Sequence, residues 1–318
     1  MPGRSGNRNS QLNNIKTLVA LERFEQQLQP SVLTHVGDPF LQQHKIELWI
    51  KRDDLLHPIV SGNKWRKLKY VLQHAFSNNK DSIISMGGQY SNHLHALAYI
   101  GKVLNISSKA FIRGERPEFL NPTLKDCCEW GMQLKFITRS RYRELRDIRE
   151  LHMQQANEYW LPEGGAVKYA LRGVAKIIEE IDIPYDVVCV PCGTATTLAG
   201  LVTSVPNQKS VFGFAALKGW GFLEQNVEQL LDHNHKIKCQ WTINHDYHFG
   251  GFARIRPELA DFIKHFQQNT GVELEPIYTG KMMFGIYDLI KQGVFRAGQR
   301  IIAIHTGGLQ GNRGFVDG

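Results

Sequence analysis

The chain has 318 residues, of which 42% are hydrophobic and 21% are charged. These values are typical of a folded soluble protein and exclude disordered, collagen-like and low-complexity chains. Basic residues exceed acidic ones, 38 to 30, but they are spread along the chain, so we do not expect nucleic-acid binding. Because no apolar run approaches the roughly 18 residues that span a bilayer, we expect no membrane segment.

The first residues, Met1 to Lys16, are polar and lack the apolar segment of a secretory signal. We interpret them as a solvated tail on a cytoplasmic protein. A mitochondrial-type presequence is the alternative, because Ile15 to Leu21 is amphipathic.

Strand-like and helix-like segments alternate from residue 82 onward. The predicted strands are Ser82–Met86, Lys109–Ile112, Leu134–Ile137, Val187–Val190, Val211–Ala216 and Ile301–Ile304. The predicted helices are one through Leu97, Ile100 and Leu104, then Asn121–Trp130, Tyr142–Tyr159, Lys168–Ile181, Thr197–Val205 and an apolar helix reaching Ile290. This alternation predicts an α/β fold with mostly parallel sheets covered by helices. Ligands of such folds bind at the carboxyl ends of strands, so the turns there are candidate sites.

Five cysteines are too few and too scattered for a disulfide framework. Cys127 and Cys128 are expected to form a buried pair on a helix. Cys189 and Cys192 have the spacing of a redox pair, but on a predicted strand residues i and i+3 point to opposite faces. We therefore do not expect redox chemistry.

Lys64 follows a Ser-Gly-Asn segment and precedes apolar residues at helical spacing, namely Trp65, Leu68, Val71, Leu72 and Ala75. It is therefore expected in the first turn of a helix, where the positive end of the dipole favours a neutral amine. A neutral amine is what forms a Schiff base. The alternative is a basic surface made of Lys64, Arg66, Lys67 and Lys69.

The segment from Gly87 to His93 follows a predicted strand, and Ser91 and Asn92 can cap the next helix. Free N–H groups at such a helix start bind carboxylates and phosphates, although ordinary capping is the alternative. We do not expect a metal at His93 and His95, because residues i and i+2 do not share a helix face.

The loop after Cys192 combines small residues with three hydroxyls, in the order Gly193, Thr194, Ala195, Thr196 and Thr197. Its N–H groups and hydroxyls can surround a phosphate, which a plain helix cap would not require. It matches neither a Walker loop nor a dinucleotide fingerprint.

Two further turns with hydroxyls follow, Tyr278-Thr279-Gly280-Lys281 and His305-Thr306-Gly307-Gly308. Together with Lys51-Arg52-Asp53-Asp54 and the segments above, they resemble the D-cysteine desulfhydrase / 1-aminocyclopropane-1-carboxylate (ACC) deaminase family. That family belongs to the pyridoxal-phosphate enzymes of fold type II, which are similar to tryptophan synthase β. The motifs occur in family order over most of the chain.

The resemblance implies pyridoxal 5'-phosphate as cofactor, a small amino acid as substrate and a homodimer. It also implies two domains with mostly parallel twisted sheets flanked by helices. Residues 1–67 and 166–318 would form the larger, cofactor-binding domain. Residues 68–165 would form the smaller inserted domain with the Ser-Asn-His loop, and the cofactor would lie between the two.

The resemblance also implies roles for single residues. Lys64 would hold the cofactor as an internal aldimine, and Asn92 would contact its ring hydroxyl. Ser91 would hold the substrate carboxylate or assist proton transfer, with His93 and Tyr278 also at the substrate. The cofactor phosphate would be held by Gly193, Thr194, Ala195, Thr196 and Thr197.

Thr279 or Thr306 would lie near the pyridine nitrogen, where a hydroxyl gives a weaker electron sink than a carboxylate and suits elimination. Relatives that are ACC deaminases typically carry Glu and Leu at these two positions. The resemblance therefore favours β-elimination of the D-cysteine desulfhydrase kind, which yields a keto acid and ammonia. ACC deamination, racemisation or a lapsed cofactor-binding protein are the alternatives. Tyr90 and Phe252 depart from the family pattern and motivate the last of these.

Overall fold

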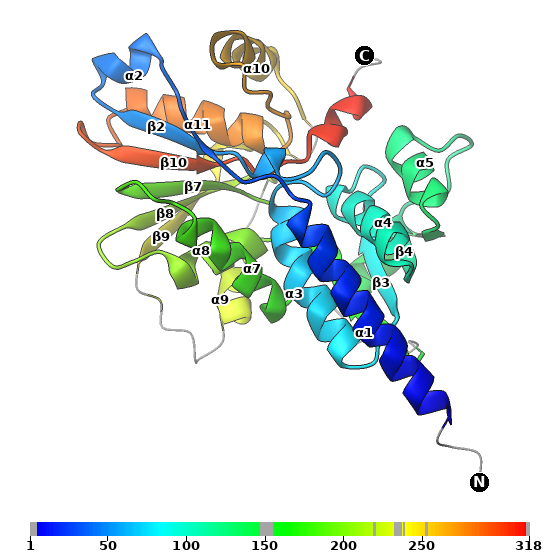
Figure 1. The fold of residues 1–318 in the computed structure, drawn as a ribbon. Coiled ribbons are helices and arrows are strands. Elements are labelled where there is room, and N and C mark those ends of the chain that lie inside the picture. Colours follow the sequence, from blue (N-terminus) through cyan, green and yellow to red (C-terminus); the bar gives the residue numbers. More distant parts are fainter. Residues whose placement is uncertain are drawn as a thin grey trace.

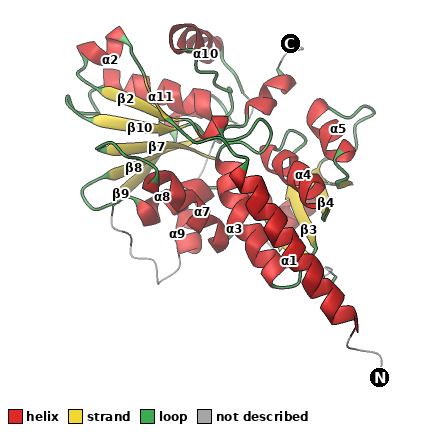
Figure 2. Cartoon of the chain, viewed as in Figure 1, coloured by secondary structure: helices red, strands yellow, loops and turns green. Residues whose placement is uncertain are grey.

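Two β-sheets flanked by helices make up the part of the chain that the structure, a computed structural model, describes (Figure 1 and Figure 2). The described residues are 5–146, 155–218, 221–231, 237, 239–251 and 254–315. The α/β class with mostly parallel sheets is confirmed.

The larger sheet has six strands in the order β1-β2-β10-β7-β8-β9. Their bounds are β1 Leu33–His35, β2 Glu47–Lys51, β10 Arg300–Ile304, β7 Val187–Cys192, β8 Ser210–Ala215 and β9 Gln240–Asn244. β1 is antiparallel to β2, and the other neighbouring strands are parallel. The carboxyl ends of β2, β10, β7 and β8 therefore meet at one edge of the sheet.

Helices bury both faces of the larger sheet (Figure 1). On one face lie α2 Pro39–Gln43, α10 Pro257–Thr270 and α11 Thr279–Lys291, and on the other lie α7 Lys168–Glu179, α8 Thr196–Ser204 and α9 Phe222–Leu231. Successive strand residues alternate between the two cores: Val188 packs with α7 and α8, and Cys189 packs with α11. Burial on both faces explains why these strands read as continuous apolar runs.

The smaller sheet has four parallel strands in the order β5-β4-β3-β6. Their bounds are β5 Gln133–Ile137, β4 Ser107–Arg113, β3 Ser82–Gly87 and β6 Glu158–Leu161. The helices α4 Asn92–Leu104, α5 Pro122–Glu129 and α6 Arg139–Arg146 belong to this part of the molecule. Between the two sheets lies α3 Asn63–Ser77, with α1 Ser5–Gln26 along it (Figure 1).

Short 3₁₀ helices complete the described elements. They are η1 Asp53–Leu55, η2 Glu163–Gly165, η3 Asp246–His248 and η4 Leu309–Gly314. No described helix combines the length and the apolar composition needed to cross a bilayer.

The predicted strands coincide with β3, β4, β5, β7, β8 and β10. The helix predicted over Tyr142–Tyr159 is wrong at its end, because Glu158–Leu161 is strand β6, paired with β3. Residues 147–154 of that prediction lie outside the described residues. The strand depends on a partner 76 residues away, in pairings such as Leu161 with Ser85, and no local pattern reveals such a partner.

The solvated tail is also wrong for residues 5–16, which belong to α1. The helix forms because its later turns bury Leu21 and Phe24, and Phe24 packs against Trp65 of α3 at 5.2 Å between ring centroids. Amphipathic packing of this kind stabilises a helix beyond its local propensity.

Of the predicted buried pair on α5, Cys127 is buried but Cys128 is exposed, which corrects that prediction. Cys189 and Cys192 are free thiols packed in opposite cores of the larger sheet, as the strand periodicity predicts. The predicted domain boundary between residues 67 and 68 falls inside α3, and the division into domains stays a prediction.

Candidate active site

Lys64 lies in the first turn of α3, as predicted. Gly62, the residue before α3, has φ 62°, and a Cβ there would lie 2.0 Å from the carbonyl oxygen of Thr306. Glycine thus lets the start of α3 lie directly against the turn that follows β10. The amide of Asn63 donates to the same Thr306 oxygen at 3.3 Å.

The side chain of Lys64 connects to the loop after β7. Lys64 Nζ donates to Asn63 Oδ1 at 2.5 Å, and Asn63 Nδ2 donates to Thr197 Oγ1 at 2.9 Å. Burial lowers the pKa of Lys64 to about 8, although the nearby Glu275 carboxyl opposes this effect. The amine is therefore partly neutral near pH 8, and the cause is burial; the effect of the helix dipole stays a prediction.

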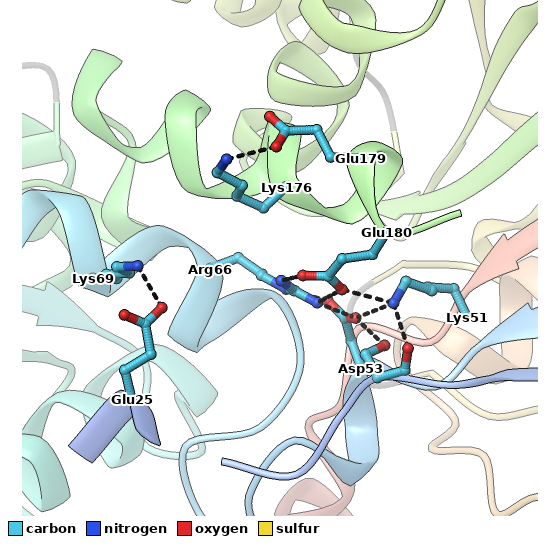
Figure 3. A network of polar contacts seen from close by, with 9 residues as sticks. Glu25, Lys51, Asp53, Arg66, Lys69, Lys176, Glu179 and Glu180 are labelled. Carbon is cyan, nitrogen blue, oxygen red and sulfur yellow. Dashed lines mark hydrogen bonds and ion pairs between the residues drawn. The ribbon is translucent and has the colours of Figure 1, made fainter. Parts of the chain in front are cut away.

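An ion-pair network fixes the segment that leads to Lys64 (Figure 3); its members Lys51, Asp53 and Arg66 are buried, and Glu180 is exposed. Arg66 donates to both oxygens of Asp53 at 2.9 Å, and it also pairs with Glu180 after α7. Lys51 donates to Glu180 at 2.8 Å and to a backbone carbonyl at 2.6 Å. The Lys-Arg-Asp-Asp motif therefore holds the start of α3 in place.

The basic-surface alternative for Lys64 is wrong, because Arg66 and Lys67 are buried. Lys67 lies one turn after Lys64, and its Nζ donates to the carbonyl of Gly164 at 2.6 Å. Gly164 in turn packs on Thr194, since a Cβ at Gly164 would lie 2.7 Å from Thr194 Cγ2. Burial, and then the charge of Lys64, lower the pKa of Lys67 well below its ordinary value.

The loop from Gly193 to Thr197 connects β7 to α8, as predicted. Ala195 has φ 61° and directly precedes the helix, so the loop turns sharply into the α8 start. The hydroxyls of Thr194 and Thr196 lie 3.0 Å apart. Converging hydroxyls, a helix N-terminus and the buried amine of Lys67 are donors of the kind that bind an anion.

Ser91 caps α4 by accepting a hydrogen bond from Leu94 N at 3.2 Å. Asn92 is the first residue of that helix, and its Nδ2 lies beside Gly308, where a Cβ would approach to 2.6 Å. The turn after β10 therefore lies against the start of α4 as well as the start of α3.

His93 points into the fold between β3 and η2. Its Nε2 donates to Ser85 Oγ at 2.9 Å, because the Ser85 hydroxyl proton goes to the carbonyl of Leu161. Burial and the charges of Lys67 and Lys64 lower the pKa of His93 to about 3, so the ring is neutral. Contact between His93 and a substrate stays a prediction.

The turn before α11 is held by Glu275, a buried residue that the sequence analysis missed. Its carboxylate accepts backbone hydrogen bonds from Ile277, Tyr278 and Thr279 at 2.6 to 2.8 Å. The hydroxyl of Thr279 lies 3.2 Å from Glu275 Oε1. The Tyr278 ring packs on Gly193, where a Cβ would lie 3.1 Å from Cε1, so this turn borders the loop after β7.

Lys281 ends the same motif and is buried. Its Nζ donates to the carbonyls of Ala216, His248 and Gly251 at 3.2, 3.0 and 2.8 Å. Burial lowers the pKa of Lys281 to about 8. The lysine therefore joins the end of β8 to the loop after η3.

The structure thus brings all the predicted site segments to one place, at the carboxyl edges of the strands. The residues described above that sequence reasoning missed as site residues are Lys67, Glu180 and Glu275. Lys67 was detectable, because it stands three residues after Lys64 and shares its helix face. Glu180 contacts Arg66 across 114 positions, whereas Glu275 bonds the amides of residues two to four positions later. Of the two residues that depart from the family pattern, Phe252 lies outside the described residues, and Tyr90 is 37% exposed.

These residues fit a pyridoxal-phosphate cofactor. Lys64, with its lowered pKa, can react with the cofactor aldehyde. The hydroxyls of Thr194 and Thr196, together with Lys67, can bind the cofactor phosphate. Asn92 Nδ2 has no hydrogen-bond partner among the described residues and can donate to a further group.

Comparison with known proteins agrees with this class of enzyme. The family described as "Pyridoxal-phosphate dependent enzyme" matches residues 37–307. In solved structures the fold matches an "ACC deaminase homologue" with a TM-score of 0.74 and 24% identity, covering 95% of this chain and 97% of that chain. It also matches threonine deaminase of Solanum lycopersicum with a TM-score of 0.64 and 14% identity, covering 96% and 90% of the two chains. The fold is therefore that of a fold type II enzyme, and the chain belongs to the pyridoxal-phosphate-dependent family.

Two curated relatives indicate which pyridoxal-phosphate enzymes this chain is similar to. A Pyrococcus abyssi protein named "Putative 1-aminocyclopropane-1-carboxylate deaminase" is 30% identical, covering 84% of this chain and 86% of its own. A mitochondrial Arabidopsis thaliana protein named "Bifunctional D-cysteine desulfhydrase/1-aminocyclopropane-1-carboxylate deaminase" is 29% identical, covering 85% and 74%. The chain is thus an enzyme similar to ACC deaminases and D-cysteine desulfhydrases, with pyridoxal phosphate as cofactor.

Proposed function

We propose that the protein catalyses β-elimination from a small D-amino acid such as D-cysteine, releasing sulfide, a keto acid and ammonia. The observation that supports this choice is the pair of hydroxyl residues, Thr279 and Thr306, at positions where the family's ACC deaminases carry Glu and Leu. Both threonines are buried at the site. Thr279 is engaged with Glu275, which makes Thr306 the better candidate for the pyridine nitrogen.

The cofactor would be held by residues of both sheets. Lys64 Nζ would bind its aldehyde carbon, while Gly193, Thr194, Ala195, Thr196 and Thr197 would surround the phosphate. Lys67 would add a donor there, since its buried amine bonds the carbonyl of Gly164 beside Thr194. Asn92 would donate Nδ2 to the ring oxygen.

When bound, pyridoxal phosphate supplies the electron sink that lets a carbon next to an amino group lose its proton. Lys64 Nζ takes that proton, and its lowered pKa makes the neutral form available near pH 8. The link from Lys64 through Asn63 to Thr197 keeps the amine at the loop after β7. Because the amine is held in place, proton transfer to it does not require an encounter between free molecules in solution, which lowers the barrier.

The substrate carboxylate would lie at the start of α4, which Ser91 caps, because amides at a helix start bind carboxylates. The Tyr278 ring packs on Gly193 of the loop after β7. Burial raises the pKa of Tyr278, so its hydroxyl stays protonated and can donate to the leaving group.

A second candidate function is ACC deamination, favoured by the names of the two relatives. The two reactions give different products with the purified protein. D-Cysteine elimination yields sulfide and a three-carbon keto acid, whereas ACC deamination yields a four-carbon keto acid without sulfide. We expect turnover of D-cysteine to exceed turnover of ACC and of L-cysteine. A higher rate with ACC would contradict the proposal.

Lys64→Ala is the control for the chemistry. It should remove the cofactor absorbance at about 410–425 nm together with keto-acid production. Bound cofactor without a keto acid from any D- or L-amino acid would favour a lapsed enzyme, and inversion at the α-carbon would favour racemisation.

We also propose two domains with the boundaries given above, a homodimer and a cytoplasmic location. The strands of the smaller sheet all lie within 82–161, which supports the division. The five free cysteines fit a reducing compartment. The homodimer is supported by the family resemblance, and sedimentation velocity would test it.

A further inference from the structure

The last described helix, η4, joins the larger-sheet part of the chain to the helices of the smaller sheet. Arg313 Nη2 donates to Asp126 of α5 at 2.7 Å. Gln310 Oε1 accepts from the hydroxyl of Thr123, also on α5, at 2.7 Å. Gln310 Nε2 donates to Asn92 Oδ1 at the start of α4, at 2.5 Å. The side chain of Gln310 therefore lies between the proposed cofactor residue Asn92 and a polar cluster behind it.

The direction of these hydrogen bonds is set by Arg313. A guanidinium can only donate, and Arg313 Nη2 lies 3.1 Å from Gln310 Oε1. The atom of Gln310 that faces Arg313 must therefore be its oxygen. It follows that the Gln310 atom facing Asn92 is the nitrogen, because an amide has one of each.

The orientation of the Asn92 amide follows in the same way. Since Gln310 Nε2 can only donate, the Asn92 atom that faces it must be Oδ1. Asn92 Nδ2 then points the other way, beside Gly308 in the turn after β10. Among the described residues no acceptor is bonded to Nδ2, so it is available as a donor to a ligand.

His95 and Asp126 hold Arg313 in this position. His95 Nε2 lies 2.9 Å from Asp126 Oδ2, and the same oxygen accepts from Arg313. His95 Nε2 can donate its proton to Asp126. The two hydrogens of Arg313 Nη2 then go one to Asp126 and one to Gln310 Oε1. Burial alone would raise the pKa of Asp126, but the bonds from Arg313 and His95 lower it, so the carboxylate is charged.

We propose that Gln310 is a positioning residue that fixes the Asn92 amide with its Nδ2 toward the cofactor ring oxygen. An N–H donor fixed at that place bonds more strongly to a deprotonated ring oxygen than to a protonated one, and so stabilises the deprotonated form. The inference rests on the proposed role of Asn92. It extends that role to a residue that touches neither cofactor nor substrate.

Replacement of Gln310 by glutamate tests the proposal, because a carboxylate accepts only and reverses the direction of the bond to Asn92. We expect the absorbance of bound pyridoxal phosphate at about 410–425 nm to fall in Gln310→Glu, with a matching rise at shorter wavelength. We also expect the Kd for pyridoxal phosphate to rise about tenfold, the effect of one lost hydrogen bond to a charged acceptor. Gln310→Leu, of similar size, should show a smaller change in the same direction.

Thr123→Val is the matched control. It removes the other donor to Gln310 Oε1 but leaves Arg313, so the direction of the chain is unchanged. Its spectrum and Kd should equal those of the wild type. A purely structural role for Gln310 would instead make both substitutions equivalent, through loss of contact between η4 and α5.

A double variant shows whether Gln310→Glu changes the cofactor spectrum through Asn92 or through another residue. Asn92→Ala and Asn92→Ala with Gln310→Glu should have the same spectrum, because Gln310 then has no amide to orient. A further change in the double variant would overturn the proposal, as would a wild-type spectrum in Gln310→Glu. Failure of the proposed function is a different result: the wild type itself would then lack the 410–425 nm band, or Lys64→Ala would keep it.

Discussion

Asn63 Nδ2 donates to Thr197 Oγ1 over 2.9 Å and so joins the first turn of α3 to the first turn of α8, 134 residues later in the chain. The same Asn63 side chain accepts from Lys64 through Oδ1. One amide therefore sets the distance between the reactive lysine and the hydroxyl-rich loop.

Asn63→Ala should weaken both folding and cofactor binding. Loss of a buried hydrogen bond that leaves Thr197 without its partner costs about 1–3 kcal/mol of unfolding free energy, to be measured by urea denaturation. The Kd for pyridoxal phosphate should rise as well. Asn14→Ala is the control, since Asn14 Nδ2 bonds Asn79 Oδ1 at 3.1 Å far from the site, and its Kd should stay unchanged.

Gly62→Ala should abolish cofactor binding. The new Cβ would stand 2.0 Å from the Thr306 carbonyl, and the positive φ is strained for alanine, so the start of α3 must move. We expect a loss of at least about 2 kcal/mol in stability and no absorbance at about 410–425 nm. Gly37→Ala, with nothing within 4 Å of its Cβ, should behave as wild type. Equal behaviour of the two variants would argue against the contact.

Asp53→Ala should be strongly destabilising, by about 3–5 kcal/mol, because it leaves the Arg66 charge buried with Glu180 as its remaining partner. Urea unfolding would measure the loss. The comparison is Lys176→Ala, which breaks the exposed pair with Glu179 and should cost less than about 1 kcal/mol. Similar losses for both would show that the buried network contributes little.

The stability of the cofactor-free protein should rise with pH between about 8 and 10.5. Lys64 has a folded pKa of about 8, below its ordinary value, so the unfolded chain binds more protons in this range and deprotonation favours folding. Lys64→Met removes this contribution. It should raise Tm most near pH 7, and the difference from the wild type should shrink toward pH 10. A difference independent of pH would contradict the lowered pKa.

The sequence predicted the site where the signal is local. Lys64 at a helix start, Ser91 as a cap and the loop from Gly193 to Thr197 each depend on residues within a few positions, and the structure places them as expected. The alternation of strands and helices likewise predicted the parallel sheets, because both faces of these strands are buried.

The rest depended on partners far away in the chain. Glu180 meets Arg66 across 114 positions, and Gln310 meets Asn92 across 218, so neither has a recognisable local pattern. Strand β6 was read as helix because its pairing with β3, not its own composition, decides its conformation. Residues 5–16 were read as tail because the helix is stabilised by Leu21 and Phe24 further along.

The strand order has a consequence for biosynthesis. β10 lies in the middle of the larger sheet, between β2 and β7, yet it is the last described strand to be translated. The smaller sheet, contained within residues 82–161, can form while the ribosome is still producing the remainder. The centre of the larger sheet cannot form before residue 304 has been made, and the contact of Thr306 with the start of α3 forms after that. Nascent chains arrested before that point would expose the unpaired edges of β2 and β7, which are sites for aggregation.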